Sequence, residues 1–363
     1  MDLGFLTVPL TMAAMAFGFA VITDTQTVHI EKINVPASVS GPTGYTPGVI
    51  IAHLADEMRV IEREAHTGAQ ARSIQLQGQK NWLMVLADYV KVTPLIRVAQ
   101  ESAGLIPFSF SGEIVLHDND LEFVLRGFDD NSKPEYIATR GHPDQLPALI
   151  KETAYEAMRV IDPYILAAYQ FKHDYRTRDF SPTLEIIRRE LTNTDTRNHK
   201  WMYNLWGMVL YQQADRAGAI DKFKAALALD PNFASPLLNL GVVLARQGNN
   251  LEAIDKFKHV TTNRRGDANQ ATKAAAHAEW GFSLALLGHY DQAFAKFKEA
   301  TSADPGFADV YSSWAEVLSV LGRTEDASKM TARSLKLAPN EVVYTENLIG
   351  SVQNLPATAS IVN

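Results

Sequence analysis

The feature that most constrains the fold is a spacing that recurs along the C-terminal part of the chain. Gly207 is followed by Ala219, Phe223 and Pro231 at offsets of 12, 16 and 24 residues. Gly241 lies 34 residues after the first glycine and is followed by alanine and phenylalanine at the same first two offsets. The pattern recurs twice more, as Trp280, Gly281, Ala293, Phe297, Ala300 and Pro305, and then as Trp314, Ala315, Ala327 and Pro339. A fixed period of this length predicts stacked supersecondary units.

Each unit is predicted to be a pair of antiparallel helices. Small residues at the Gly207 and Ala219 positions allow the two helices to approach closely, large residues fill the space between them, and the proline ends the second helix. On these residues, the region from about 200 to 339 resembles the tetratricopeptide repeat family, whose pattern is W-x-x-L-G followed by Y, A, F, A and P. The resemblance implies an α-solenoid.

The repeats depart from the family pattern in three places. Gly241 and Gly281 are separated by 40 residues, so about six extra residues lie near 262–273 and are expected to lengthen a turn or a helix end. The second unit has Val260 and Arg265 in place of alanine and proline. The fourth unit has threonine in place of phenylalanine, at position 331.

Three segments flank the repeats. Residues 163–199 are predicted to be a degenerate hairpin and linker, with helices at 163–169 and 181–191. A closing helix at 342–352 is expected to cover the last apolar face of the repeat domain, which we place at 200–352. Residues 353–363 are expected to form a flexible tail.

The N-terminal segment 1–24 predicts a membrane anchor. No charged residue lies between Asp2 and Asp24, and residues 3–22 are apolar over about the length needed to cross a bilayer as a helix. Two alternatives remain open. The segment could be a cleaved secretory signal, although it lacks the basic start of such signals, or a buried helix of a soluble protein.

The orientation of this anchor is weakly specified, because Lys32 is the only basic residue close to it. Single-pass anchors of bacteria often carry their downstream domain in the periplasm. We therefore expect a single-pass membrane protein of bacterial type whose soluble part is periplasmic. The chain contains no cysteine, which fits compartments of either redox state.

The middle of the chain, residues 25–162, is expected to form a small α+β domain. Residues 36–48 are rich in Gly, Pro and Ser and predict a loop, after which Thr46 caps a helix with Pro47 in its first turn. Strands are predicted at 25–35, 108–116, 121–128 and 135–139, the last three as a meander, and helices at 47–64, 82–92, 94–103 and 146–161. The sequence resembles no family in this region.

No motif at diagnostic spacing points to catalysis. The His-Asp-Asn-Asp sequence at 117–120 is typical of a tight turn and lacks the ligand spacing of a calcium loop. The glycines of 41–48 precede a helix without either phosphate-binding pattern. A net charge of −7 disfavours nucleic acid as a partner. We therefore expect no cofactor, no metal and no enzymatic activity.

The tetratricopeptide resemblance implies a concave groove lined by the first helix of each hairpin, in which family members bind a peptide or a helix. The positions that correspond to this lining are Trp201, Asn204, Met208, Tyr211, Leu238, Val242, Arg246, Phe282 and Leu286, with Ser312 and Glu316 at the end. These residues are mostly apolar and do not include the basic set with which some members hold a terminal carboxylate. The resemblance therefore implies a protein partner with an apolar or amphipathic segment.

An alternative is that a neighbouring helix, the middle domain or a second copy of the chain covers these positions, which would make the protein a homo-oligomer. The chain is thus predicted to be mainly α, with an N-terminal transmembrane helix, a small α+β domain and a C-terminal solenoid. The function we expect is a membrane-anchored scaffold or assembly factor. The alternatives are a sensor, in which the α+β domain binds a small molecule and the repeats transmit the signal, and an enzyme.

Overall fold

The computed structural model describes residues 27–65, 73–76, 108–128, 134–194, 196–263 and 267–337, with isolated positions at 89, 91, 95 and 98. The chain divides into two compact units, of which the first reaches residue 169 and the second continues from residue 170. The predicted helices at 3–22, 82–92, 94–103 and 342–352 and the tail at 353–363 lie outside the described residues. In the described part of the chain, no helix is both long enough and apolar enough to span a membrane.

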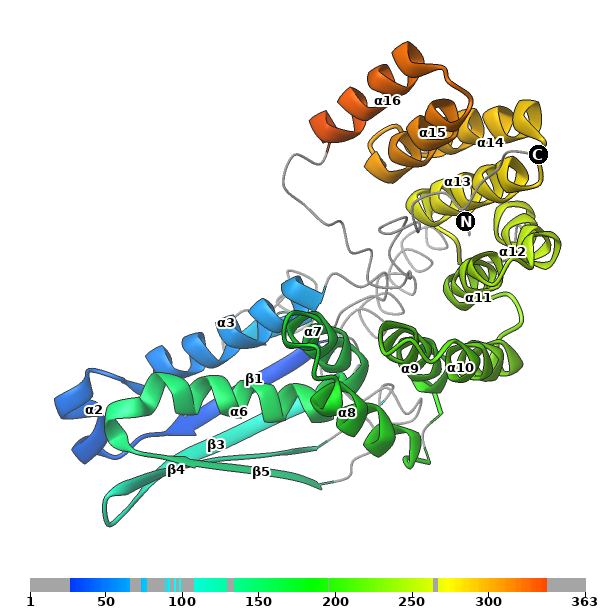
Figure 1. Cartoon of the computed structure of the whole chain (residues 1–363). Helices are drawn as coiled ribbons and strands as arrows, with labels where there is room; N and C mark the ends of the chain where they lie inside the picture. The colour runs from blue at the N-terminus through cyan, green and yellow to red at the C-terminus, as the bar shows by residue number, and fades with distance from the viewer. Residues whose placement is uncertain are drawn as a thin grey trace, which may run out of the picture. The chain divides into compact units, whose positions relative to one another are not determined.

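The first unit is built on a five-stranded sheet with the order β2-β1-β3-β4-β5 (Figure 1). The strands are β1 (Thr27–Asn34), β2 (Ser73–Leu76), β3 (Phe108–His117), β4 (Asp120–Phe128) and β5 (Pro134–Gly141). β1 pairs in parallel with β2 and β3, whereas β3, β4 and β5 pair antiparallel. The predicted meander is therefore confirmed. The short parallel strand β2 was not predicted.

Two long helices, α3 (Pro47–Ala65) and α6 (Leu146–Ile161), pack against each other and against the same face of this sheet (Figure 1). As predicted, Thr46 stands before the first turn of α3, where its hydroxyl accepts a bond from the N–H of Val49 at 3.4 Å. The apolar stripe of α3 is buried, with Leu54 and Met58 fully enclosed. Burial of these stripes against the sheet forms the core of the first unit.

The connection from β1 to α3 differs from the prediction. Residues 36–48 were expected to be a loop, but they contain the short helix α2 (Ala37–Thr43). Gly44 ends this helix with a φ of 72°, and its N–H donates to the carbonyl of Ser40. A glycine in the left-handed conformation is a common helix end, and the Gly- and Pro-rich composition concealed the short helix before it.

β1 itself contains an irregularity that period-2 reasoning could not place. Val28, Ile30 and Ile33 are all buried, which breaks strict alternation. The pairing of β1 with β3 shifts register between Ile30 and Ile33. A bulge at this point brings Ile33 back to the core side of the sheet, so all three side chains can pack against the helices.

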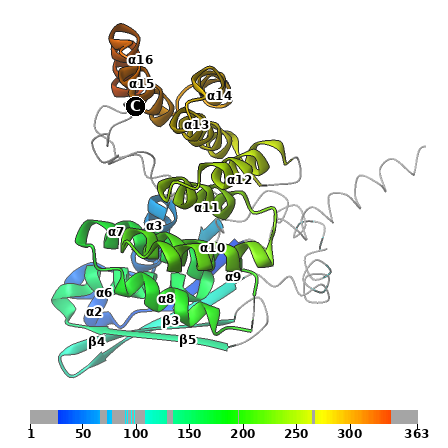
Figure 2. The same ribbon diagram turned by 45° about the vertical axis from the view of Figure 1, so that its right-hand side comes forward.

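The second unit contains four helical hairpins in succession (Figure 1, Figure 2). They are α9 (His199–Gln212) with α10 (Arg216–Leu229), α11 (Ala234–Arg246) with α12 (Asn250–Thr262), α13 (Gln270–Leu286) with α14 (Tyr290–Ala303), and α15 (Ala308–Val320) with α16 (Thr324–Leu337). Before them lie α7 (Pro163–Thr177) and α8 (Ser181–Leu191). The predicted hairpins at 200–339 are confirmed.

The recurring glycines act by removing a side chain at the point of closest approach within a hairpin. A Cβ atom added to Gly241 would lie 2.5 Å from the ring of Phe257, and one added to Gly207 would overlap the ring of Phe223. Both phenylalanines are fully buried. The periodic glycine and the phenylalanine 16 residues later are therefore one packing unit.

The six extra residues between the second and third hairpins have two effects. They extend the first helix of the third hairpin, because α13 has 17 residues whereas α11 and α15 have 13 each. They also supply Asp267, whose carboxylate accepts a bond from the backbone N–H of Ala234 at 2.7 Å. The insertion thus contacts the N-terminus of α11, a function that spacing alone could not show.

Candidate partner-binding surface

The first helices of the four hairpins form a continuous layer. α9 contacts α11, α11 contacts α13 and α13 contacts α15. The second helices α10, α12 and α14 each pack against the first helix of their own hairpin and against the first helix of the next hairpin. We call the surface of α9, α11, α13 and α15 the inner face. All of the predicted groove residues lie on these four helices.

The structure separates the predicted groove residues into buried and accessible ones. Five side chains are enclosed, with exposed fractions of 3% or less, namely Asn204, Met208, Leu238, Val242 and Phe282. Leu286 is 41% exposed, Ser312 is exposed, and Trp201, Tyr211, Arg246 and Glu316 are half-buried. A partner that docks on the inner face therefore has direct access to the second group, whereas the first group contributes to packing within the chain.

Buried asparagines connect the first two hairpins beneath this face. The side-chain amide of Asn239 donates to the side-chain oxygen of Asn204 at 3.0 Å, and both residues have no exposed surface. A buried amide pair of this kind is stable only when its hydrogen bonds are made. Asn204 thus positions α9 against α11.

A group of charged residues connects the second and third hairpins on the inner face. Arg246 on α11 donates to Glu279 on α13 at 3.4 Å, and the guanidinium lies 5.8 Å from the ring centre of Phe282. The Glu279 carboxylate raises the pKa of Arg246, with smaller contributions from Tyr211 and Glu316, and burial opposes them. We call Arg246, Glu279 and Glu316 the inner-face charge cluster.

Glu279 is paired with Arg246, and Glu316 lies close enough to both for their charges to affect its pKa. Burial raises the pKa of Glu316, the neighbouring Glu279 raises it further, and Arg246 lowers it. Only 6% of the Glu279 side chain is exposed, and its Oε2 atom has no hydrogen-bond partner. The cluster therefore carries an excess of one negative charge in surroundings that are largely apolar.

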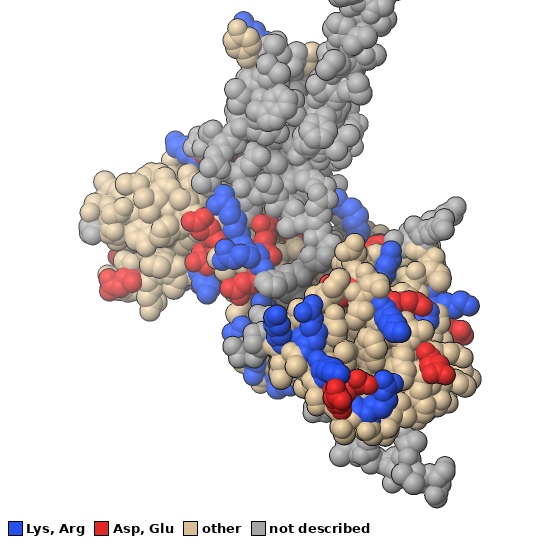
Figure 3. All heavy atoms as spheres, turned by 90° about the horizontal axis from the view of Figure 1, so that it is seen from above, with Lys and Arg blue, Asp and Glu red and all other residues tan. Residues whose placement is uncertain are grey.

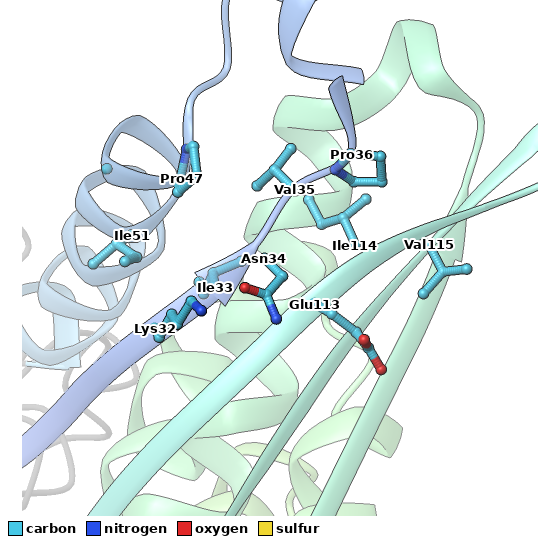
Figure 4. A pocket seen from close by; sticks show the side chains of 11 residues that line it. Lys32, Ile33, Asn34, Val35, Pro36, Pro47, Ile51, Glu113, Ile114 and Val115 are labelled. Atoms are coloured by element: carbon cyan, nitrogen blue, oxygen red, sulfur yellow. The ribbon is translucent and has the colours of Figure 1, made fainter. Parts of the chain in front are cut away.

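The first unit offers a different candidate, a pocket of about 580 Å³. Figure 4 shows its lining, which comes from the end of β1, from β3 and from the first turns of α3. Most of the wall is apolar, and the charged groups are Lys32 and Glu113. Glu113 is paired with Arg126 at 2.7 Å, so the charge that remains is positive.

The position of this pocket is one that α/β sheets favour. It lies at the carboxyl end of β1, beside the parallel strand β3, and faces the N-terminus of α3. β1 has a parallel neighbour on each side, β2 on one and β3 on the other. Open sheets bind small ligands outside the carboxyl ends of their parallel strands.

Neither candidate surface has the charge of a nucleic-acid site. On the face visible in Figure 3, Lys and Arg side chains lie close to Asp and Glu side chains. Among the residues that the structure describes, no group of three His, Asp or Glu side chains is placed to hold a metal ion.

Two family comparisons match the repeat region. Residues 207–248 match a family described as TPR repeat, and residues 284–345 match one described as tetratricopeptide repeat. No curated protein matches the chain. The resemblance inferred from the glycine and phenylalanine spacing is thereby confirmed.

Several solved structures are similar over about half of the chain. MamA is 19% identical, covering 47% of this chain and 94% of its own, with a TM-score of 0.36. PilW, a widely conserved type IV pilus biogenesis factor, is 17% identical over 51% of this chain and 81% of its own, with a TM-score of 0.42. YrrB, a TPR protein with an unusual peptide-binding site, is 19% identical over 51% and 92%, with a TM-score of 0.34. Similarities at this level say nothing about the partner of this chain.

Proposed function

Because residues 200–339 of this chain are tetratricopeptide repeats, we propose that the protein is a scaffold or assembly factor that binds a protein partner on the inner face. The observation that carries this proposal is the accessible set on four consecutive first helices, in which Leu286 exposes 41% of its surface beside half-buried Trp201 and Tyr211. Aromatic and apolar side chains that stay partly open, around a single charged cluster, are typical of a protein interface.

The test compares variants of the accessible residues, because substitutions at the enclosed ones would unfold the hairpins. Tyr211→Glu with Leu286→Glu alters the inner face. The matched control is Leu251→Glu with Leu335→Glu, which changes apolar residues that are 72% and 60% exposed on the second helices α12 and α16. A partner that is retained by the parent chain and the control, and lost from the inner-face variant, supports the proposal.

We further propose that residues 3–22 anchor the protein in a membrane, with the soluble part in the periplasm. The support is the charge-free apolar length of this segment. Membrane fractionation of the full chain and of Ala14→Arg with Phe17→Arg tests the anchor. Release of the double variant into the soluble fraction supports it, whereas equal behaviour of both chains contradicts it.

The pocket of the first unit favours a second candidate function, that of a sensor for a small anionic molecule. Its wall is apolar, its unbalanced charge is that of Lys32, and its volume is typical of small-molecule sites. Thermal unfolding of the full chain in a panel of small carboxylates and phosphates tests this function. Stabilisation that disappears in Lys32→Gln and persists in Lys151→Gln, on the exposed side of α6, supports it.

A further inference from the structure

The inner-face charge cluster has a property that packing within the chain does not explain. Glu279 is only 5% exposed, so water cannot readily reach its carboxylate, yet its Oε2 atom accepts no hydrogen bond. One turn further along α13, the hydroxyl of Ser283 is also without a partner, in a residue with no exposed surface. Polar atoms that are buried without a partner are uncommon and costly, and here two lie one helical turn apart.

The charge balance shows which kind of group is missing. Arg246 already faces two carboxylates, those of Glu279 and Glu316, so an additional anion would be repelled. An additional cation would be attracted by the excess negative charge, and the low polarity of the surroundings strengthens that attraction. A lysine or arginine side chain would also supply N–H donors to the half-buried Glu316 carboxylate.

A partner can reach the cluster from the part of the inner face that is exposed to solvent. Glu316 is half-buried and Leu286, on the same helix as Glu279, is 41% exposed. A partner that covers Leu286 with apolar side chains would therefore place a neighbouring residue close to the two carboxylates. The partner must then combine apolar contacts with one basic side chain.

We propose that the inner-face charge cluster is a specificity site for a basic residue, and that the partner segment carries one lysine or arginine among apolar residues. This inference rests on the proposed function, since it names the partner chemistry of the same surface. The half-buried Glu316 carboxylate accepts the basic group, Glu279 supplies the second negative charge beside it, and Arg246 holds Glu279 in position.

The test uses synthetic peptides of alanine and leucine that differ only at a central residue, which is arginine, lysine, glutamine or glutamate. Their affinities for the purified full chain are measured by fluorescence anisotropy. We expect the basic peptides to bind about tenfold more tightly than the glutamine peptide, which is the size of a charge-assisted contact. This preference should disappear in Glu279→Gln and in Glu316→Gln, and it should persist in Glu325→Gln on α16.

A variant that reverses the charge of the cluster keeps the test decisive even if Glu279→Gln fails to fold. Glu316→Lys should favour the glutamate peptide over the arginine peptide, which mere loss of structure cannot produce. Equal binding of all four peptides, or binding of none, overturns the inference. The proposed function is judged separately, because Tyr211→Glu with Leu286→Glu tests the inner face whatever the central residue is.

Discussion

The carboxylate of Asp267 accepts a hydrogen bond from the backbone N–H of Ala234 at 2.7 Å, across 33 residues of sequence. Ala234 begins α11, and the residue at its N-cap is Phe233, which has no side-chain oxygen to offer. The segment that interrupts the repeat spacing therefore supplies the cap that the local sequence lacks. A negative charge at this end of a helix is also favourable.

We expect Asp267→Ala to destabilise the repeat unit by about 1 kcal/mol, the typical effect of removing a helix cap. Urea unfolding of the full chain measures the change. Asp267→Asn keeps an acceptor oxygen and should lose less. Equal stability of the alanine variant and the parent would show that the bond is not formed in solution.

A buried carboxylate fixes the helix before the repeats. Asp174 on α7 is 3% exposed and accepts bonds from the N–H of Thr183 at 3.0 Å, from its hydroxyl at 2.6 Å, and from the side chain of Gln170 at 2.7 Å. Asp174→Ala leaves the N–H and the hydroxyl of the buried Thr183 without this acceptor. We expect a loss of about 3 kcal/mol in the free energy of unfolding.

The matched control for this change is Asp179→Ala. Asp179 also bonds the start of α8, through the N–H of Ser181 at 3.0 Å, but it is exposed. Water can replace that bond, so about 1 kcal/mol or less is expected. Similar losses in the two variants would mean that burial of Asp174 does not add to its contribution.

At Gly241, helix propensity and side-chain packing predict opposite effects of a substitution on stability. Gly241→Ala should increase helix propensity by up to about 1 kcal/mol, yet the new Cβ would collide with the ring of Phe257. We expect net destabilisation of about 1–3 kcal/mol, because overpacking outweighs propensity. Gly48→Ala, in the first turn of α3 with no atom near the added Cβ, should be neutral or stabilising. Thermal unfolding of both variants distinguishes the two effects.

In the fourth hairpin of this chain, both residues of the glycine and phenylalanine pair are replaced. The fourth hairpin has Ala315 at the glycine position and Thr331 at the phenylalanine position. Because threonine is smaller than phenylalanine, Thr331 leaves room for the methyl group of Ala315. Stabilisation of the chain by Gly241→Ala would contradict the packing account.

The stability of the first unit should depend on pH through Glu62. Burial raises the pKa of Glu62 to about 7, the neighbouring Asp162 raises it further, and Arg59 opposes them. A pKa raised in the folded state contributes stability that is complete below the ordinary value of 4.5 and is lost as the pH rises through about 7. Glu62→Gln should therefore be more stable than the parent at pH 8.5, by about 1–2 kcal/mol after allowance for partial exposure, and should show no gain at pH 4.

Thermal unfolding across this pH range measures the difference. Glu57→Gln makes the same chemical change on the same helix and is the matched control. A parent chain whose stability stays constant between pH 5 and pH 8.5 would rule out the raised pKa.

The local elements follow closely from the sequence because their signals are local. The helix predicted at 146–161 has the bounds observed for α6, and the strands of the meander differ from the predicted ones by at most two residues at any end. Apolar side chains at helical or strand spacing identify the buried face of each element. By contrast, α2 and β2 carry weak signals, since seven and four residues are too few to show a period.

The candidate surface was predicted only in part. The resemblance gave the helices of the inner face, but it could not separate Met208, which is 3% exposed, from Leu286, which is 41% exposed. It also could not show that Arg246 and Glu279, 33 residues apart, form a pair in which the buried Oε2 atom of Glu279 lacks a partner. Exposure and pairing depend on which side chains meet across neighbouring hairpins.

The sequence by itself determined the repeat and its register, because a glycine and a phenylalanine 16 residues apart must face each other once two helices of this length fold back on one another. Only the tertiary structure decided what the insertion contacts and how the charges of the inner face are balanced. Asp267 reaches the start of α11, and Glu279 meets Arg246, through contacts between successive hairpins. Such contacts depend on three-dimensional packing, which the spacing of residues along one chain does not specify.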